Sequence, residues 1–117
     1  MTTPPKTYDA DTIGDRLADI PGWKFGDGLI YREYSTDGWP TTLMLVNVIG
    51  YACEAADHHP DLMVTWAKVV VSLSTHSAGG VTDFDLAMAR RIDEVALWRP
   101  GPDSVLRGVQ RPFVQGV

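Results

Sequence analysis

The architecture follows from signals in residues 54–87, which read EAADHHPDLMVTWAKVVVSLSTHSAGGVTDFDLA. The first part of this stretch favours a helix, and Pro60 ends it because the residue before a proline is pushed out of the α region. Two runs with strand propensity follow at residues 62–66 and 68–75, of which the second is rich in valine. We therefore expect a helix that ends just before Pro60, with two consecutive strands after it.

Another helix is predicted after the loop at residues 77–80. Thr82 and Asp85 have the spacing of a capping box, in which each side chain accepts a hydrogen bond from the other residue's backbone. Apolar residues then recur on one helical face: Phe84, Met88, Ile92, Val95 and Ala96. This helix is expected to run from Thr82 to about Leu97.

The residues at the start of the chain predict an arm and a short helix. Residues 1–7 are polar, contain two prolines and are expected to form a loose arm. Asp9 or Asp11 can cap the helix that follows. Its apolar stripe is Ile13, Leu17 and Ile20, and Pro21-Gly22 ends it.

A hairpin and a long helix are predicted next. Residues 23–25 and 29–35 are rich in aromatic and β-branched residues, and the glycine-containing turn at 26–28 joins them. Pro40 suits the first turn of a helix that we expect to reach about Asp57. Since this helix is apolar over several turns, we expect it to be largely buried.

These elements predict an α+β fold. Their order is helix, two strands, helix, two strands, helix, and the simplest packing is a four-stranded antiparallel sheet with three helices on one face. We expect one domain over residues 1–98. Residues 99–117 contain prolines, glycines and arginines without helical or strand periodicity, and are expected to form a separate tail.

Composition narrows the class of protein. The 117 residues are 44% hydrophobic and 21% charged, as in ordinary globular domains. The net charge of −5 argues against nucleic acid or an anionic membrane as a partner. Cys53 is the single cysteine and has no internal disulfide partner. The first residues lack the features of a secretion signal, so we expect a cytoplasmic protein.

Three histidines are the main chemical signal. His58, His59 and His76 are the whole histidine complement of the chain, and the first two lie at the predicted helix end. An imidazole with a pKa of roughly 6.5 can give or accept a proton near neutral pH. Glu54, four residues before His58, and the adjacent Asp57 are carboxylates that can orient an imidazole.

The spacing of this cluster resembles that of the pterin-4a-carbinolamine dehydratases. Three residues lie between Glu54 and the His58-His59-Pro60 step, and five lie between Pro60 and Trp66. Nine residues then lie between Trp66 and His76, and eight between His76 and Asp85. The resemblance extends with less detail over residues 23–96. It implies dehydration of a 4a-hydroxytetrahydropterin to a quinonoid dihydropterin and water, without metal or organic cofactor. It also implies a homodimer or homotetramer, and phenylalanine hydroxylase as a metabolic companion.

The resemblance also suggests roles for individual residues. His58 and His76 are expected to transfer protons, with roles that can be exchanged, and His59 to bind the substrate. Ser74 and Thr75 can present polar backbone groups to the pterin, although strand pairing is the simpler role. Supporting positions are expected for Glu54, Asp57 and Asp85, and Asp85 can alternatively serve only as a helix cap. Trp66 is expected in the core, with a place in the pocket wall as the alternative. Phe84 occupies a position where family members often carry arginine.

Three alternatives remain open at this point. The histidines could hold a zinc ion, although adjacent histidines rarely turn both rings to one ion. The fold also serves as a non-catalytic binding module, in relatives that are dimerisation partners of transcription factors or assembly factors for RuBisCO, and fold alone does not decide between these functions. The tail, with a net charge of +2 from three arginines and Asp103, is either a disordered end or a strap across a neighbouring subunit.

Overall fold

A computed structural model describes residues 5–117, so most of the predicted arm, residues 1–4, lies outside the described residues. The elements are α1 (Ala10–Leu17), β1 (Lys24–Gly26), β2 (Leu29–Thr36), α2 (Trp39–Ala56), β3 (Asp61–Thr65), β4 (Lys68–Leu73), the 3₁₀ turn η1 (His76–Ala78), α3 (Asp83–Ala96) and β5 (Val114–Gly116). The predicted α+β class is confirmed.

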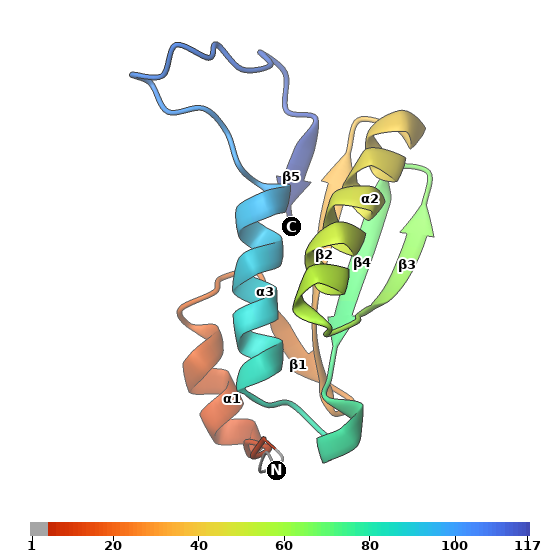
Figure 1. The fold of residues 1–117 in the computed structure, drawn as a ribbon, viewed down its shortest axis with the longest axis vertical. Coiled ribbons are helices and arrows are strands. Elements are labelled where there is room, and N and C mark those ends of the chain that lie inside the picture. The colour runs from red at the N-terminus through yellow and green to blue at the C-terminus, as the bar shows by residue number, and fades with distance from the viewer. Residues whose placement is uncertain (1–4) are drawn as a thin grey trace.

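The four strands that the sequence predicts have the order β1-β2-β4-β3, and β5 pairs with β2 as a fifth strand. Every pairing in the sheet is antiparallel. The three helices cover one of its faces, with α2 and α3 side by side (Figure 1). β4 shows why this face is buried: Val69, Val71 and Leu73 alternate with less buried residues and point to the helices. Opposite them lie the buried faces of α2, with Ile49, and of α3, with Ile92.

Our expectation that α2 is largely buried is wrong, because the outer face of this helix is exposed. Leu45, Ile49 and Cys53, spaced by four residues, are buried against the sheet. Met44 is exposed, and Tyr51 is 78% exposed, on the remaining surface of the same helix. The physical reason is that α2 lies on the outside of a two-layer domain, so only one side of it meets the sheet. Among residues 5–117, no helix is long and apolar enough to cross a membrane.

Trp66 also differs from its predicted place in the core. It lies in the turn between β3 and β4 and is 68% exposed. Its backbone carbonyl accepts a hydrogen bond from the Thr42 hydroxyl at 2.9 Å. Its ring lies over Gly38, where an added Cβ would come within 3.4 Å of the indole. Trp66 therefore covers the start of α2 from outside the core.

The C-terminal segment returns to the sheet of its own subunit. Residues 101–112 form an exposed loop that projects away from the body of the domain (Figure 1). β5 then pairs with the end of β2, where Thr36 lies opposite Val114. Arg111 binds Asp37 at 2.9 Å and anchors the returning chain. A strand of three residues in a segment rich in proline and glycine has no recognisable periodicity, and the sequence did not predict it.

Candidate functional site

The end of α2 determines where His58 lies. Asp57 adopts the left-handed conformation, with φ of 51°, and its N–H donates to the carbonyl of Glu54. The N–H of His58 donates to the carbonyl of Cys53 at 3.1 Å. These two bonds form a Schellman motif, and Asp tolerates the left-handed conformation better than most residues do. His58 is thereby turned out of the helical path and toward the start of α3.

The start of α3 supplies the partner of His58. The predicted capping box is present: the Thr82 hydroxyl accepts from the N–H of Phe84, and Oδ2 of Asp85 accepts from the N–H of Thr82 at 2.8 Å. The same Oδ2 also accepts from the Thr75 hydroxyl at 2.8 Å. Since these bonds occupy Oδ2, the other oxygen of this fully buried carboxylate remains for a further partner.

That partner is the imidazole of His58, whose Nε2 lies 2.6 Å from Oδ1 of Asp85. The pair joins residues 27 positions apart, and the His58 ring is itself mostly buried. Thr75 immediately precedes His76, so its bonds to Asp85 and Thr82 tie the end of β4 to the same cluster. The carboxylate at position 85 thus both caps α3 and orients an imidazole.

The remaining predicted residues lie around this cluster. Glu54 makes no hydrogen bond or ion pair to His58. Its carboxylate lies 3.3 Å from Nε2 of His59, and both side chains are exposed. His76 opens η1 and is exposed, and Ser74 is partly buried at the end of β4. Within residues 5–117, no hydrogen bond or ion pair joins His76 to the other histidines.

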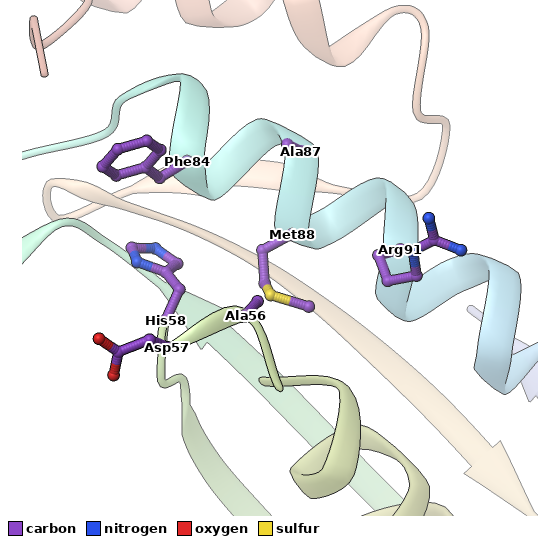
Figure 2. A pocket seen from close by; sticks show the side chains of 7 residues that line it. All are labelled: Ala56, Asp57, His58, Phe84, Ala87, Met88 and Arg91. Carbon is purple, nitrogen blue, oxygen red and sulfur yellow. The ribbon is translucent and has the colours of Figure 1, made fainter. Parts of the chain in front are cut away.

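A pocket of about 540 Å³ lies beside His58, between the end of α2 and α3 (Figure 2). The Phe84 ring meets the His58 ring edge to face, with centroids 6.0 Å apart and an interplanar angle of 66°. The lining residues are Ala56, Asp57, His58, Phe84, Ala87, Met88 and Arg91. Sequence reasoning missed Arg91 as a pocket residue, although its position seven residues after Phe84 places both on one helical face.

The sequence profile described as pterin 4 alpha carbinolamine dehydratase matches residues 6–95. The chain belongs to this family. The matched region includes all of the elements that build the cluster around His58, and it ends before the projecting loop and β5. The C-terminal strand therefore lies outside the matched region.

Relatives and a solved structure agree with this membership. A protein of Aquifex aeolicus is 47% identical over 85 residues, which cover 73% of this chain and 86% of the relative. A protein of Nocardia farcinica is 41% identical over 96 residues, which cover 82% and 99%. Both carry the name "Putative pterin-4-alpha-carbinolamine dehydratase". The crystal structure of a transcriptional coactivator/pterin dehydratase from Brucella melitensis matches with a TM-score of 0.73 at 28% identity, over 78% of this chain and 99% of that one.

The cysteine and the possible metal ligands of this dehydratase-family domain add little to the chemistry of the site. Burial raises the pKa of the Cys53 thiol to about 11, so the thiol stays protonated at neutral pH and is a poor nucleophile. Within residues 5–117, no group of three or more His, Cys, Asp or Glu side chains is arranged to hold a metal ion. The main polar feature of the site is therefore the His58–Asp85 pair, whose carboxylate also accepts hydrogen bonds from Thr75 and Thr82.

Proposed function

We propose that this chain catalyses the dehydration of a 4a-hydroxytetrahydropterin to the quinonoid dihydropterin and water. The observation that carries the proposal is the His58–Asp85 pair at the edge of the pocket. The pocket volume of about 540 Å³ falls within the range usual for small-molecule sites. Membership of the dehydratase family supports the same reaction.

The reaction requires one proton to be given and one to be taken. The bond between C4a and the hydroxyl oxygen breaks, and the electron pair of the adjacent ring nitrogen forms a double bond to C4a. A proton joins the departing hydroxide to make water, and the nitrogen loses its own proton. No external oxidant or reductant is needed, so acid–base groups are sufficient.

His58 suits one of these proton transfers. The Asp85 carboxylate accepts a hydrogen bond from Nε2–H, which leaves Nδ1 of a neutral imidazole as the proton acceptor. In the protonated ring, Nδ1–H is the donor. We propose that His76 performs the complementary transfer, and the two roles can be exchanged.

The other residues are proposed to bind or support. His59 holds the substrate, with its ring oriented by Glu54 at 3.3 Å. Ser74 and Thr75 present the end of β4 to the pterin, and the Thr75 hydroxyl additionally fixes Asp85. Asp57 supports the site through the left-handed turn that ends α2.

A stopped-flow assay of 4a-hydroxytetrahydropterin breakdown tests the proposal. The wild-type protein should accelerate breakdown over buffer, and His58→Ala and His76→Ala should each lower the rate constant by about 10²-fold or more. The matched control is Arg90→Ala, because Arg90 is exposed and lies outside the pocket lining. If wild-type protein gave no acceleration, the enzymatic function would be rejected.

A non-catalytic binding role is the second candidate function. The related crystal structure is described as a transcriptional coactivator/pterin dehydratase, which supports a protein-binding role for some relatives. The exposed apolar side chains of α2, such as Met44 and Tyr51, also support protein contacts and the proposed homodimer or homotetramer. Light scattering at several protein concentrations tests the oligomer, and a mass equal to one chain at all of them would reject it.

The proposal also covers the role of the C-terminal tail, the location of the protein in the cell and its metabolic companion. Since β5 pairs with β2 of its own chain, the part of residues 99–117 that could strap a neighbouring subunit is the exposed loop at residues 101–112. If it does so, truncation before Arg99 should lower the oligomeric mass, and an unchanged mass would contradict the strap. A reducing, cytoplasmic setting is supported by a single, buried cysteine. A link to phenylalanine hydroxylase follows from the proposed reaction, because that class of enzyme consumes reduced pterin.

A further inference from the structure

One face of α3 forms a continuous side of the pocket. Phe84, Met88 and Arg91 line it at intervals of four and three residues (Figure 2). A rise of 1.5 Å per residue separates the first and last of these by about 10 Å along the helix axis. That length suits a bicyclic ring that carries a short substituent.

Phe84 stands at the histidine end of this face. Its side chain is 54% exposed, although large aromatic side chains are usually more buried than this. It is held beside the His58 ring in an edge-to-face contact, which leaves much of the ring surface open to the pocket. An exposed aromatic face next to an acid–base group can stack with a planar heterocycle.

Apolar side chains line the middle of the pocket. Met88 is buried and points toward Ala56 of α2 (Figure 2), and Ala87 completes this part of the lining. These side chains offer no charged group to the ligand. They therefore favour a flat, weakly polar ring over a branched or charged one at this position.

Arg91 stands at the opposite end of the same helical face. Its side chain is 64% exposed, and its guanidinium pairs with Glu94 at 2.8 Å, three residues later on the same helix. Exposed pairs of this kind contribute little, so the guanidinium can exchange Glu94 for a ligand at small cost. Arginine presents several N–H donors in a fork that matches a carboxylate or a phosphate.

We propose that Phe84 and Arg91 select the substrate at two points: Phe84 stacks on the pterin ring beside His58, and Arg91 binds an anionic substituent at the far end of the ring. The inference rests on the proposed function, because it takes the substrate to be a reduced pterin. It deepens that function by naming the substrate class as pterins whose side chain carries a carboxylate or phosphate, in preference to a neutral polyol.

Binding of stable pterins tests this selection independently of turnover. The probes are 6-carboxypterin, 7,8-dihydroneopterin monophosphate and the neutral 7,8-dihydrobiopterin, each titrated by calorimetry. Wild-type protein should bind at least one anionic probe roughly tenfold more tightly than the neutral one, as expected for a charge-assisted contact at an exposed site. The comparison between the first two probes separates carboxylate from phosphate recognition.

Two variants separate the two contact points. Arg91→Gln should abolish the preference for anionic probes while it leaves affinity for 7,8-dihydrobiopterin within about twofold, and the exposed neighbour Arg90→Gln should retain the preference. Phe84→Ala should lower the affinity for all three probes by about 2-fold to 10-fold, and Phe84→Tyr should restore this affinity. Thermal melts check that each variant is folded.

The outcomes distinguish this inference from the proposed reaction. Unchanged probe affinities in both Phe84→Ala and Arg91→Gln would overturn the inference, and so would a wild-type protein that prefers the neutral probe. Neither result would affect the stopped-flow acceleration expected of the wild type. Conversely, wild-type protein that binds anionic pterins in the predicted pattern without accelerating breakdown would support the selection at Phe84 and Arg91 and overturn the enzymatic function.

Discussion

Nε2 of His58 lies 2.6 Å from Oδ1 of Asp85, while Oδ2 of the same carboxylate accepts hydrogen bonds from Thr82 and Thr75. One buried carboxylate thus joins three segments: the end of α2, the end of β4 and the start of α3. Because its three partners come from separate elements, the orientation of the imidazole depends on the tertiary fold. The capping interaction and the histidine interaction are two consequences of a single side chain.

Asp85→Asn is expected to lower the rate of dehydration by about 10²-fold while the protein remains folded. The amide oxygen can replace Oδ2 toward Thr75 and Thr82, which leaves the amide NH₂ facing Nε2 of His58. A neutral His58 ring would then accept at Nε2 and carry its proton on Nδ1, the reverse of the tautomer that the carboxylate favours. The stopped-flow rate constant measures the loss, and ¹⁵N chemical shifts of His58 report the tautomer.

Thr75→Val provides the comparison for this variant. It removes one hydrogen bond to Asp85 and leaves the carboxylate on His58, so the tautomer should be retained and the rate should fall less than in Asp85→Asn. A full wild-type rate in Asp85→Asn, with the tautomer reversed, would show that His58 transfers no proton.

Ile49→Ala should lower the free energy of unfolding by about 2–5 kcal/mol, because Ile49 is completely buried between α2 and the sheet. Met44→Ala on the same helix should change it by under about 1 kcal/mol, because the Met44 side chain is exposed. Urea unfolding at matched protein concentration measures both. Equal losses in the two variants would mean that the outer face of α2 is covered in solution.

Local signals in the sequence were sufficient for most of the fold. Pro60 marks the end of α2 within a few residues, and Thr82 with Asp85 marks the start of α3. The alternation in β4 reports burial on one face because side chains in a strand point to opposite sides in turn. Each of these signals lies within a few residues of the structure that it predicts.

The pairing of His58 required information that no local pattern contains. Glu54 is four residues from His58, which suggested a contact on one helical face, but the left-handed Asp57 takes His58 off the helix before that contact can form. The actual partner, Asp85, lies 27 residues away. The exposed face of α2 was missed for a similar reason, since an apolar helix carries no sign of how many of its sides will be covered.

Acidic pH should remove a contribution that Asp37 makes to stability. The Thr41 hydroxyl at 2.5 Å, followed by the Arg111 guanidinium at 2.9 Å, holds the pKa of Asp37 below its ordinary value. A carboxyl whose pKa is lower in the folded state stabilises the fold above its unfolded pKa of about 3.9, and this contribution is lost as the pH falls through the folded value. Asp37→Asn should therefore melt below the wild type at pH 7, and the gap should narrow below about pH 4.

Thermal melts of both proteins at pH 7, 5 and 3 measure this gap. Asp15→Asn, which removes the same charge at an exposed position of α1, controls for the change in net charge. A gap between wild type and Asp37→Asn that is the same at pH 3 as at pH 7 would contradict the role of the ionised carboxyl.

Val114→Asp is expected to detach β5 and destabilise the domain, whereas Val105→Asp should be nearly neutral. Val114 is 7% exposed and pairs with Thr36 at the end of β2. An aspartate at this position would bury an unpaired charge, which costs several kcal/mol unless the strand leaves the sheet. Val105 is 93% exposed at the projecting loop, where the same substitution meets only water. Hydrogen exchange of the Asp37 and Val117 amides measures detachment, because the Asp37 N–H donates to the carbonyl of Phe113 at 3.1 Å and the Val117 N–H donates to the carbonyl of Glu33 at 2.9 Å. Since β5 lies beyond the region shared with the family, an unchanged exchange rate in Val114→Asp would mean that this chain's C-terminal segment does not contribute to holding the end of β2.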